Sequence, residues 1–225
     1  MDVSQNLTEI KANIEAACQK NNRNPEDVTI IAVTKYVTIE RTKEAINAGL
    51  LNLGENRQEG FIEKYNHFGK TVSWHFIGSL QTRKVKDIID KVDYIHSLDR
   101  LSLAKEINKR ASTVMDCFVQ VNVSGEESKH GIQPENVMQF IEEISEYTNI
   151  RIVGLMTMAP HSDDKALLHK VFSELRELRD KVKQRNYRHA PCNYLSMGMS
   201  NDYEVAIMEG ATHIRIGSKL VGENM

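Results

Sequence analysis

Eight short apolar runs alternate with segments of helical periodicity, and this rhythm constrains the fold more than any other feature of the chain. Each run has the length of a strand and ends in a polar or glycine-containing tip. Parallel strands require crossover connections, usually helices, so the alternation predicts a parallel sheet. The runs are 29–35, 50–56, 72–78, 94–98, 117–122, 152–158, 194–199 and 213–217.

Several segments before and between the runs carry an apolar face at helical spacing. The first precedes all the runs and predicts an extra N-terminal helix. We expect Pro134 to begin the helix after the fifth run and Ser162 to cap the helix after the sixth. The three faces consist of Leu7, Ile10, Ile14 and Cys18; of Val137, Phe140, Ile141 and Ile144; and of Leu167, Leu168, Val171, Leu175 and Leu178.

The number of strand–helix units favours a closed α/β fold. Eight units predict a (β/α)8 barrel of the TIM type, with an open doubly wound sheet as the alternative. The 225 residues suffice for one large core but are few for two ordinary domains. We therefore expect residues 1–225 to form a single barrel domain.

The composition argues against several classes of partner. A net charge of −2, without a basic stripe interleaved with aromatics, disfavours nucleic acid binding. The apolar runs are too short to span a bilayer, and the amphipathic, acidic N-terminus does not fit a signal peptide. Cys18, Cys117 and Cys192 form no CxxC pair, which favours reduced thiols. We expect a cytoplasmic protein that binds neither nucleic acid nor membrane.

The first run, TIIAVTK, ends in Lys35. Active sites of such barrels gather at the C-terminal ends of the strands. Strand alternation puts Lys35 on the face of Ile31 and Val33, and if that face is the interior, the ammonium lies at the mouth of a partly dry cavity. Desolvation favours the neutral amine that imine formation requires. The alternative is a strand-end lysine that extends into water.

The last two runs predict a phosphate site. The seventh leads through Ser200 into a helix, where a serine offers a hydroxyl beside unpaired backbone N–H groups. The eighth ends in Gly217 and Ser218, and glycine lets the backbone approach an anion closely. Barrel phosphates are commonly bound by these two loops. Taken separately, Ser200 is also explained as a helix cap and Gly217 as a tight turn.

Arg215 should face the barrel interior, because Ile214 and Ile216 alternate with it toward the surrounding helices. A buried guanidinium needs an acceptor, stays protonated and only donates. Opposite a pyridine nitrogen it would keep that nitrogen unprotonated, which weakens the ring as an electron sink and argues against aminotransferase-like chemistry. The alternative is a structural ion pair with an interior carboxylate.

Other strand ends are polar as well. Asn56 ends the second run and can orient a ligand through its amide. His75, in the third run, is either a ligand contact or a hydrogen-bonded core histidine. Met156, in the sixth, serves packing more readily than chemistry. The polar loop 122–131 is either a lid or a solvated connection.

Several motifs, taken in order, resemble those of one family. They are AVTK, GEN, WHFIGSLQ, SLD, VNVSGEESKHG, GLMTMAP, LSMGMSND and HIRIGSKLVG, and they extend from about residue 31 to residue 222. The set resembles the pyridoxal phosphate homeostasis proteins, also called PLP-binding proteins, which are similar to the barrel domain of bacterial alanine racemase.

The resemblance implies pyridoxal 5′-phosphate (PLP) as cofactor, held as a Schiff base on Lys35. It implies phosphate contacts from Ser200 and Gly217, Arg215 near the ring nitrogen, and Asn56 near the cofactor. No catalytic residue and no metal ligand is predicted. The predicted cofactor-binding residues are Lys35, Asn56, His75, Met156, Ser200, Arg215, Gly217 and Ser218.

The resemblance also implies a role in intracellular PLP homeostasis. We expect a monomer that buffers or delivers PLP without catalysis, with PLP-dependent apoenzymes as recipients. Racemisation needs two bases, and Lys35 can supply only one of them. In alanine racemase the second base comes from a separate domain. We expect the eight-stranded barrel to leave no residues of this chain for such a domain. The alternative is a PLP-dependent racemase or related enzyme with His75 or Tyr36 as second base. A metal-dependent hydrolase using His75, His96 and His213 lacks any HxH or HExxH motif.

Overall fold

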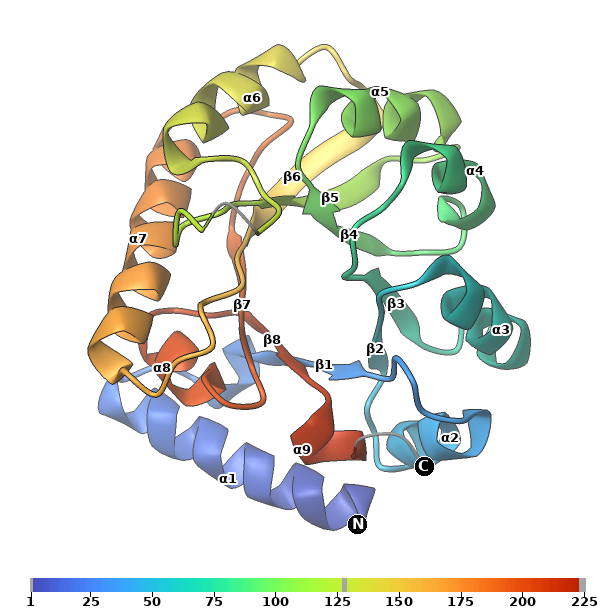
Figure 1. The fold of residues 1–225 in the computed structure, drawn as a ribbon, viewed down its shortest axis with the longest axis vertical. Helices are drawn as coiled ribbons and strands as arrows, with labels where there is room; N and C mark the ends of the chain where they lie inside the picture. The colour runs from blue at the N-terminus through green and yellow to red at the C-terminus, as the bar shows by residue number, and fades with distance from the viewer. Residues whose placement is uncertain (1, 127–128, 223–225) are drawn as a thin grey trace.

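The strands close into a barrel. In a computed structural model that describes residues 2–126 and 129–222, each strand pairs in parallel with the next, and the last pairs with the first (Figure 1). The predicted (β/α)8 barrel is confirmed, and the open sheet is wrong because Thr29 to Ala32 pair with His213 to Ile216. The strands are β1 (Thr29–Val33), β2 (Asn52–Glu55), β3 (Ser73–Phe76), β4 (Tyr94–Leu98), β5 (Met115–Gln120), β6 (Ile150–Met156), β7 (Tyr194–Met199) and β8 (His213–Ile216).

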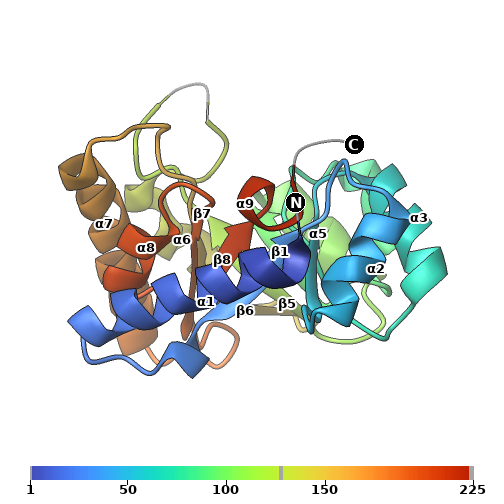
Figure 2. The same cartoon turned by 90° about the horizontal axis from the view of Figure 1, so that it is seen from below.

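Helices follow the strands and form an outer ring (Figure 1). The extra helix α1 (Val3–Lys20) precedes β1, as predicted, and lies on the outside against α8 and α9 (Figure 2). Its predicted apolar face is buried, which confirms its orientation. The other helices are α2 (Ile39–Asn47), α3 (Gln58–Phe68), α4 (Val85–Ile88), α5 (Leu101–Arg110), α6 (Val137–Glu143), α7 (Lys165–Gln184), α8 (Tyr203–Met208) and α9 (Ser218–Val221).

The two predicted helix starts differ in outcome. Pro134 begins a 3₁₀ turn that leads directly into α6, as predicted. Ser162 does not cap α7. The cap is Asp164, whose carboxylate accepts from Ala166 N at 2.9 Å and from Leu167 N at 3.3 Å. Asp164 also precedes the first turn directly, where a carboxylate interacts favourably with the helix dipole.

Strand ends differ from the ends of the apolar runs. β1 ends at Val33, and Lys35 lies in the turn that follows. β5 and β6 begin before their apolar runs, at Met115 and Ile150. An ion pair joins the two strands at these added residues, where Arg151 Nε lies 2.6 Å from an Asp116 carboxylate oxygen. Opposite charges on neighbouring strands stabilise a sheet although neither residue is apolar, so a pattern of apolar residues does not reveal these strand starts.

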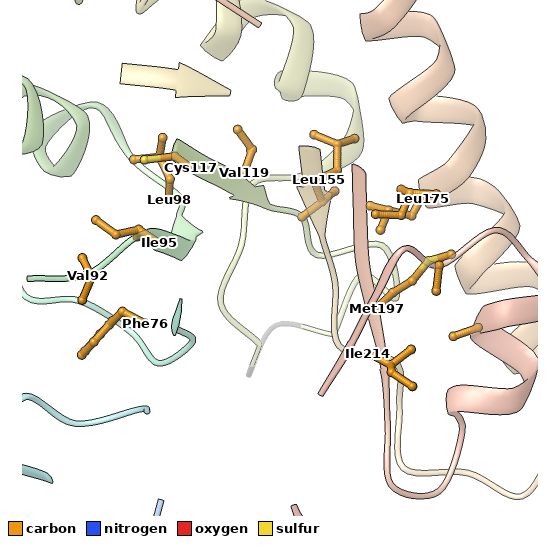
Figure 3. Packing of buried hydrophobic residues seen from close by; sticks show 14 of the residues in the cluster. Phe76, Val92, Ile95, Leu98, Cys117, Val119, Leu155, Leu175, Met197 and Ile214 are labelled. Atoms are coloured by element: carbon orange, nitrogen blue, oxygen red, sulfur yellow. The ribbon is translucent and has the colours of Figure 1, made fainter. Parts of the chain in front are cut away.

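Alternate strand residues point outward and pack beneath the helices. Ile214 and Ile216 are fully buried in this outer layer, as expected. Figure 3 shows Leu155 and Met197 of the sheet on the same side as Leu175 of α7. Because these side chains leave water on folding, the outer layer supplies the main hydrophobic stabilisation of the barrel.

The barrel interior contains aromatic and imidazole rings from several strands. His75 stacks on Tyr94 with ring centroids 4.6 Å apart, and His96 stacks on Phe118 at 4.2 Å. His213 lies 5.2 Å from Phe118. Branched aliphatic residues dominate most barrel interiors. This interior is more polar, so its buried polar atoms need hydrogen-bond partners.

The helices offer no candidate membrane span: across residues 2–126 and 129–222, none is both long and apolar enough to cross a bilayer. The cysteines Cys18, Cys117 and Cys192 are free and buried. Burial raises the pKa of Cys192 to about 12, so this thiol is unreactive at neutral pH. In the loop 122–131, residues 127 and 128 lie outside the described residues, and the lid stays a prediction.

The buried histidines predict how stability depends on pH. Burial lowers the pKa values of His75, His96 and His213, that of His213 to about 4. The unfolded chain binds protons with the ordinary histidine pKa of about 6.5, so below that pH it takes up protons that the folded barrel does not. These groups should leave the free energy of unfolding unchanged above about pH 6.5. They should lower it as the pH falls toward 4, by about 3 kcal/mol for His213 alone.

Urea denaturation at a series of pH values measures this dependence. The control is His213→Asn, which removes one titrating group and keeps a polar partner for Thr212 Oγ1. Its free energy of unfolding should fall less steeply below about pH 6.5 than that of the wild type. Equal slopes for the two proteins would contradict the prediction.

Candidate functional site

A cavity of about 510 Å³ opens at the C-terminal ends of the strands. Its walls come from the loops after β1, β2, β3, β6, β7 and β8 and from the end of β5. Closure of the barrel therefore brings together residues from both ends of the sequence. The predicted residues that line the cavity are Lys35, Asn56, Ser200, Arg215, Gly217 and Ser218.

Lys35 stands at the rim of this cavity, and its side chain is exposed. Its ammonium lies 5.3 Å from the centroid of the Tyr36 ring, and the Arg57 guanidinium lies 5.4 Å from the same centroid. The expectation of a partly desolvated lysine is wrong, because the ladder of β1 stops at Val33 and Lys35 follows in a turn. The amine is thus accessible from solvent.

Asn56 lies between Tyr36 and Gly78. The Asn56 amide bonds the Tyr36 phenol, and this bond, together with the Arg57 charge, lowers the pKa of Tyr36. Tyr36 has a φ of 71°, a left-handed conformation that few non-glycine residues adopt. A Cβ at Gly78 would lie 2.2 Å from Asn56 O, so glycine is required for this close approach. These contacts hold Asn56 at the rim beside Lys35.

A buried polar cluster supports the turn that carries Lys35. Thr34 Oγ1 donates to Glu55 Oε1 at 2.6 Å. The Lys64 ammonium lies 2.9 Å from Glu55 Oε1 and donates to Thr34 O at 2.9 Å. The Lys64 and Glu55 side chains are 5% and 2% exposed. The cluster ties α3 to the ends of β1 and β2, and so it positions the residue after Thr34.

The loops after β7 and β8 bring two hydroxyls and a glycine to the cavity wall. Ser200 is buried, and its Oγ accepts from the Gly217 N–H at 3.3 Å. A Cβ at Gly217 would meet nothing nearer than Val33 Cβ at 3.5 Å, which is ordinary contact. Packing within the protein therefore does not require glycine here, and its lack of a side chain leaves room in the cavity. Ser218 follows at the first position of α9.

Arg215 lines the cavity and is 4% exposed. Its Nη1 donates to Ser196 Oγ at 2.6 Å, and its Nη2 donates to Thr157 O at 2.9 Å. Burial lowers the Arg215 pKa to about 10, against the opposing effect of the Asp202 carboxylate, so the guanidinium stays charged at neutral pH. These hydrogen-bond partners are neutral oxygens, and within residues 2–126 and 129–222 Arg215 forms no ion pair with an interior carboxylate, so the structural ion pair is not found there.

His75 and Met156 are absent from the described lining of this cavity. His75 is a buried core histidine whose ring nitrogens bond His96 Nε2 at 2.9 Å and Asn52 Oδ1 at 3.0 Å. Met156 packs with Phe118 in the interior. His75 thus matches its alternative interpretation as a core histidine, and Met156 matches the packing role preferred for it; neither lines the cavity as a predicted cofactor-binding residue would.

The histidines of the metal hypothesis do come together. The ring centroids of His75, His96 and His213 lie 5.2 to 6.4 Å apart. The nitrogens of His75 and His96 are engaged in hydrogen bonds, however. Among the residues that the structure describes, no three or more His, Cys, Asp or Glu side chains form a group that could hold a metal ion. The geometry favours a buried polar network.

Comparisons with known proteins agree with this geometry. The family described as alanine racemase, N-terminal domain, matches residues 5–225. The pyridoxal phosphate homeostasis protein of Aquifex aeolicus is 44% identical over 227 residues, which cover 99% of each chain. The chain belongs to the pyridoxal phosphate homeostasis protein family.

Two solved structures share the fold of this chain. An unknown protein from Bifidobacterium adolescentis has a TM-score of 0.93 at 31% identity, covering 97% of this chain and 94% of that one. PipY of Synechococcus elongatus PCC7942, solved with PLP bound, has a TM-score of 0.81 at 29% identity, covering 93% of this chain and 100% of that one.

Sequence reasoning missed part of the cavity wall of this homeostasis-family chain. Gln120 is the last residue of β5, and the strand-end rule would have found it had the apolar run not been extended to residue 122. Asp202 is buried, accepts from Met199 N at 2.5 Å, and has its pKa raised by burial. Its only local signal is its place two residues after Ser200. The missed wall residues include Gln120, Met158, His161, Asn201 and Asp202.

The buried Lys64–Glu55 pair predicts a large effect on stability. Lys64→Met leaves the Glu55 charge buried without its cation, so we expect the free energy of unfolding to fall by about 3–5 kcal/mol. The matched control is Lys170→Met, which breaks an exposed pair with Glu174 at 3.9 Å and should cost less than about 1 kcal/mol. Urea denaturation measures both variants. Similar losses in the two would contradict the supporting role of Lys64.

Proposed function

We propose that the chain binds PLP through Lys35 and takes part in PLP homeostasis as a binding protein that buffers or delivers the cofactor. One observation carries the proposal. A lysine amine, a pair of loops suited to an anion and a buried guanidinium line a single cavity. These groups match the aldehyde, the phosphate and the ring nitrogen of PLP.

The residues fit these groups one by one. When bound, PLP supplies an aldehyde that condenses with an amine, with loss of water, and a ring that withdraws electrons. Lys35 would hold the cofactor by its amine. The hydroxyls of Ser200 and Ser218 would donate to the phosphate, and Gly217, which has no side chain, would let the phosphate approach the backbone. Arg215 only donates, so it would bind the ring nitrogen in its unprotonated form.

Several features support binding over catalysis. An unprotonated ring nitrogen makes a weaker electron sink than one paired with a carboxylate, which disfavours carbanion chemistry. The exposed Lys35 is open to a competing amine, which exchange of the cofactor with a recipient requires. The Aquifex aeolicus relative, which matches over its whole length, is named for homeostasis and not for a reaction.

The oligomeric state, the location in the cell and the recipients of PLP are proposed from the sequence. We propose a single-domain monomer that acts in the cytoplasm, with PLP-dependent apoenzymes as recipients. The net charge of −2 supports a protein that binds neither nucleic acid nor an anionic membrane surface.

The binding mode predicts a spectrum that depends on Lys35. Protein incubated with PLP should show a yellow absorption band, and borohydride reduction should fix the label on Lys35, located by mass spectrometry of peptides. Lys35→Ala and Lys35→Arg should both abolish the band and leave the far-UV circular dichroism unchanged, because the side chain is exposed. Lys35→Arg is the matched control, since it keeps the cation and cannot form an imine.

Two outcomes would contradict this account. A label fixed on another lysine, with the band retained in Lys35→Ala, would refute the binding mode. Turnover of amino acids at about 1–1000 per second, in racemisation or decarboxylation assays, would refute the non-catalytic role and favour the enzyme alternative.

The phosphate contacts predict a difference between PLP and pyridoxal, which lacks the phosphate. Ser200→Ala should weaken PLP binding about tenfold, because a hydrogen bond to a charged group is lost, and should leave pyridoxal binding unchanged. The control is Ser79→Ala, an exposed serine on another wall of the same cavity, which should affect neither ligand. Absorbance titration measures the affinities. Equal losses for both ligands would refute the phosphate contact.

A further inference from the structure

A chain of hydrogen bonds runs through the barrel interior from Arg215 at the cavity. Arg215 Nη1 donates to Ser196 Oγ at 2.6 Å, and Ser196 Oγ lies 2.9 Å from His96 Nδ1. His96 Nε2 lies 2.9 Å from His75 Nδ1, and His75 Nε2 lies 3.0 Å from Asn52 Oδ1. The chain thus connects β8, β7, β4, β3 and β2.

The chemistry of the end groups sets the direction of every proton in this chain. A guanidinium only donates, so Ser196 Oγ accepts from Arg215 and keeps its own proton for His96 Nδ1. A neutral His96 then carries its proton on Nε2 and donates to His75 Nδ1. His75 in turn donates from Nε2 to the oxygen of Asn52. Each donor meets an acceptor without any charged histidine.

Burial keeps both imidazole rings neutral. His96 and His75 are 0% and 1% exposed. Desolvation is the largest cause that lowers the pKa of His96 well below its usual value, followed by the repulsion that its proton would meet from protonated His75 or His213 and from Arg215; desolvation, followed by repulsion from protonated His213, does the same for His75. A protonated His96 would also place a second cation one hydroxyl away from Arg215. The directional chain is therefore the arrangement that avoids an unpaired buried charge.

We infer that His96 and His75 are positioning residues for Arg215: they draw the Ser196 hydroxyl proton toward themselves and hold the Ser196 lone pairs toward the guanidinium. The consequence for the cofactor rests on the proposed function, in which Arg215 binds the ring nitrogen. A serine hydroxyl without such an acceptor can rotate and turn its proton toward the cation. Thr157 O holds the second guanidinium nitrogen at 2.9 Å, so two fixed oxygens orient the group.

An anchored guanidinium accounts for both the polar barrel interior and the geometry of the cavity. Asp202 lines the same cavity as Arg215 and would attract the guanidinium if the latter were free to move. Anchoring from the interior side holds Arg215 away from that carboxylate. It also keeps the guanidinium donors at one place in the cavity, where a ring nitrogen can meet them.

The direction of the chain is measured by ¹⁵N NMR of the imidazole nitrogens in the whole protein without added PLP. We expect His75 and His96 to be neutral with the proton on Nε2 at every pH from about 8 to about 6, where an ordinary histidine titrates. A proton on Nδ1 of either ring, or a cationic ring in this range, would overturn the inference.

The effect on the cofactor is measured by comparing affinities for PLP and for 1-deaza-PLP, in which carbon replaces the ring nitrogen. Ser196→Ala removes one linking oxygen, and His96→Phe removes both ring nitrogens at similar size. We expect each variant to bind PLP about tenfold more weakly and the deaza ligand as tightly as the wild type does. His96→Asn, whose amide oxygen can take the place of Nδ1, should restore part of the PLP affinity.

The matched control is His213→Phe, because His213 is a buried ring in the same interior but bonds Thr212 and lies outside the chain. It should keep the wild-type preference for PLP. Equal losses for both ligands, or the same loss of preference in His213→Phe as in His96→Phe, would overturn the positioning role. Ser196→Ala decides the question if His96→Phe does not fold.

Failure of the proposed function would give a different result from failure of the positioning role. If the wild type binds neither ligand, PLP binding is refuted and the ring-nitrogen role falls with it. The NMR measurement still decides whether His75 and His96 hold the hydrogen-bond chain in the stated direction.

Discussion

The pairing of the first strand with the last decides where the functional groups of this protein lie. β1 pairs with β8 in parallel, from Thr29 beside His213 to Ala32 beside Ile216. The loops after both strands therefore meet on one rim, so an amine after β1 faces the same cavity as the anion-binding residues after β7 and β8. In an open sheet these strands need not be neighbours, and the two halves of the proposed cofactor site would have no common cavity.

Polar clusters on both sides of the sheet support this rim. Outside the barrel, Lys64 and Glu55 form a buried pair that supports the turn after β1. Inside, His75, His96 and Ser196 lead to the guanidinium in the cavity. Buried polar groups are costly unless each finds a partner, and satisfied networks are correspondingly specific in geometry. The barrel thus uses polar contacts to orient the rim and apolar contacts beneath the helices to hold the fold together.

Local rules predicted much of the fold and part of the site. The alternation of apolar runs and helical faces predicted the barrel and its extra helix, because period 2 and period 3.6 leave distinct patterns. The strand-end rule and side-chain alternation found Lys35, Ser200 and Arg215. The same rules gave wrong predictions for the cap of α7 and for the exposure of Lys35, where a shift of one or two residues changes the result. Ser162 and Asp164 are both acceptable caps, and the extent of β1 decides whether Lys35 is desolvated or exposed.

The sequence alone determined those features that depend on near neighbours in the chain. They are the order of the elements, the inward face of β8 and the residue types at the strand ends. The tertiary structure decided which polar atoms meet. Ser196 and His96 are 100 positions apart, yet their side chains lie 2.9 Å from each other. Asp202 likewise lines the cavity only because the loop after β7 follows the path that it does in the folded chain. No local pattern encodes such contacts, because they arise only when the closed sheet turns alternate residues of distant strands toward one axis.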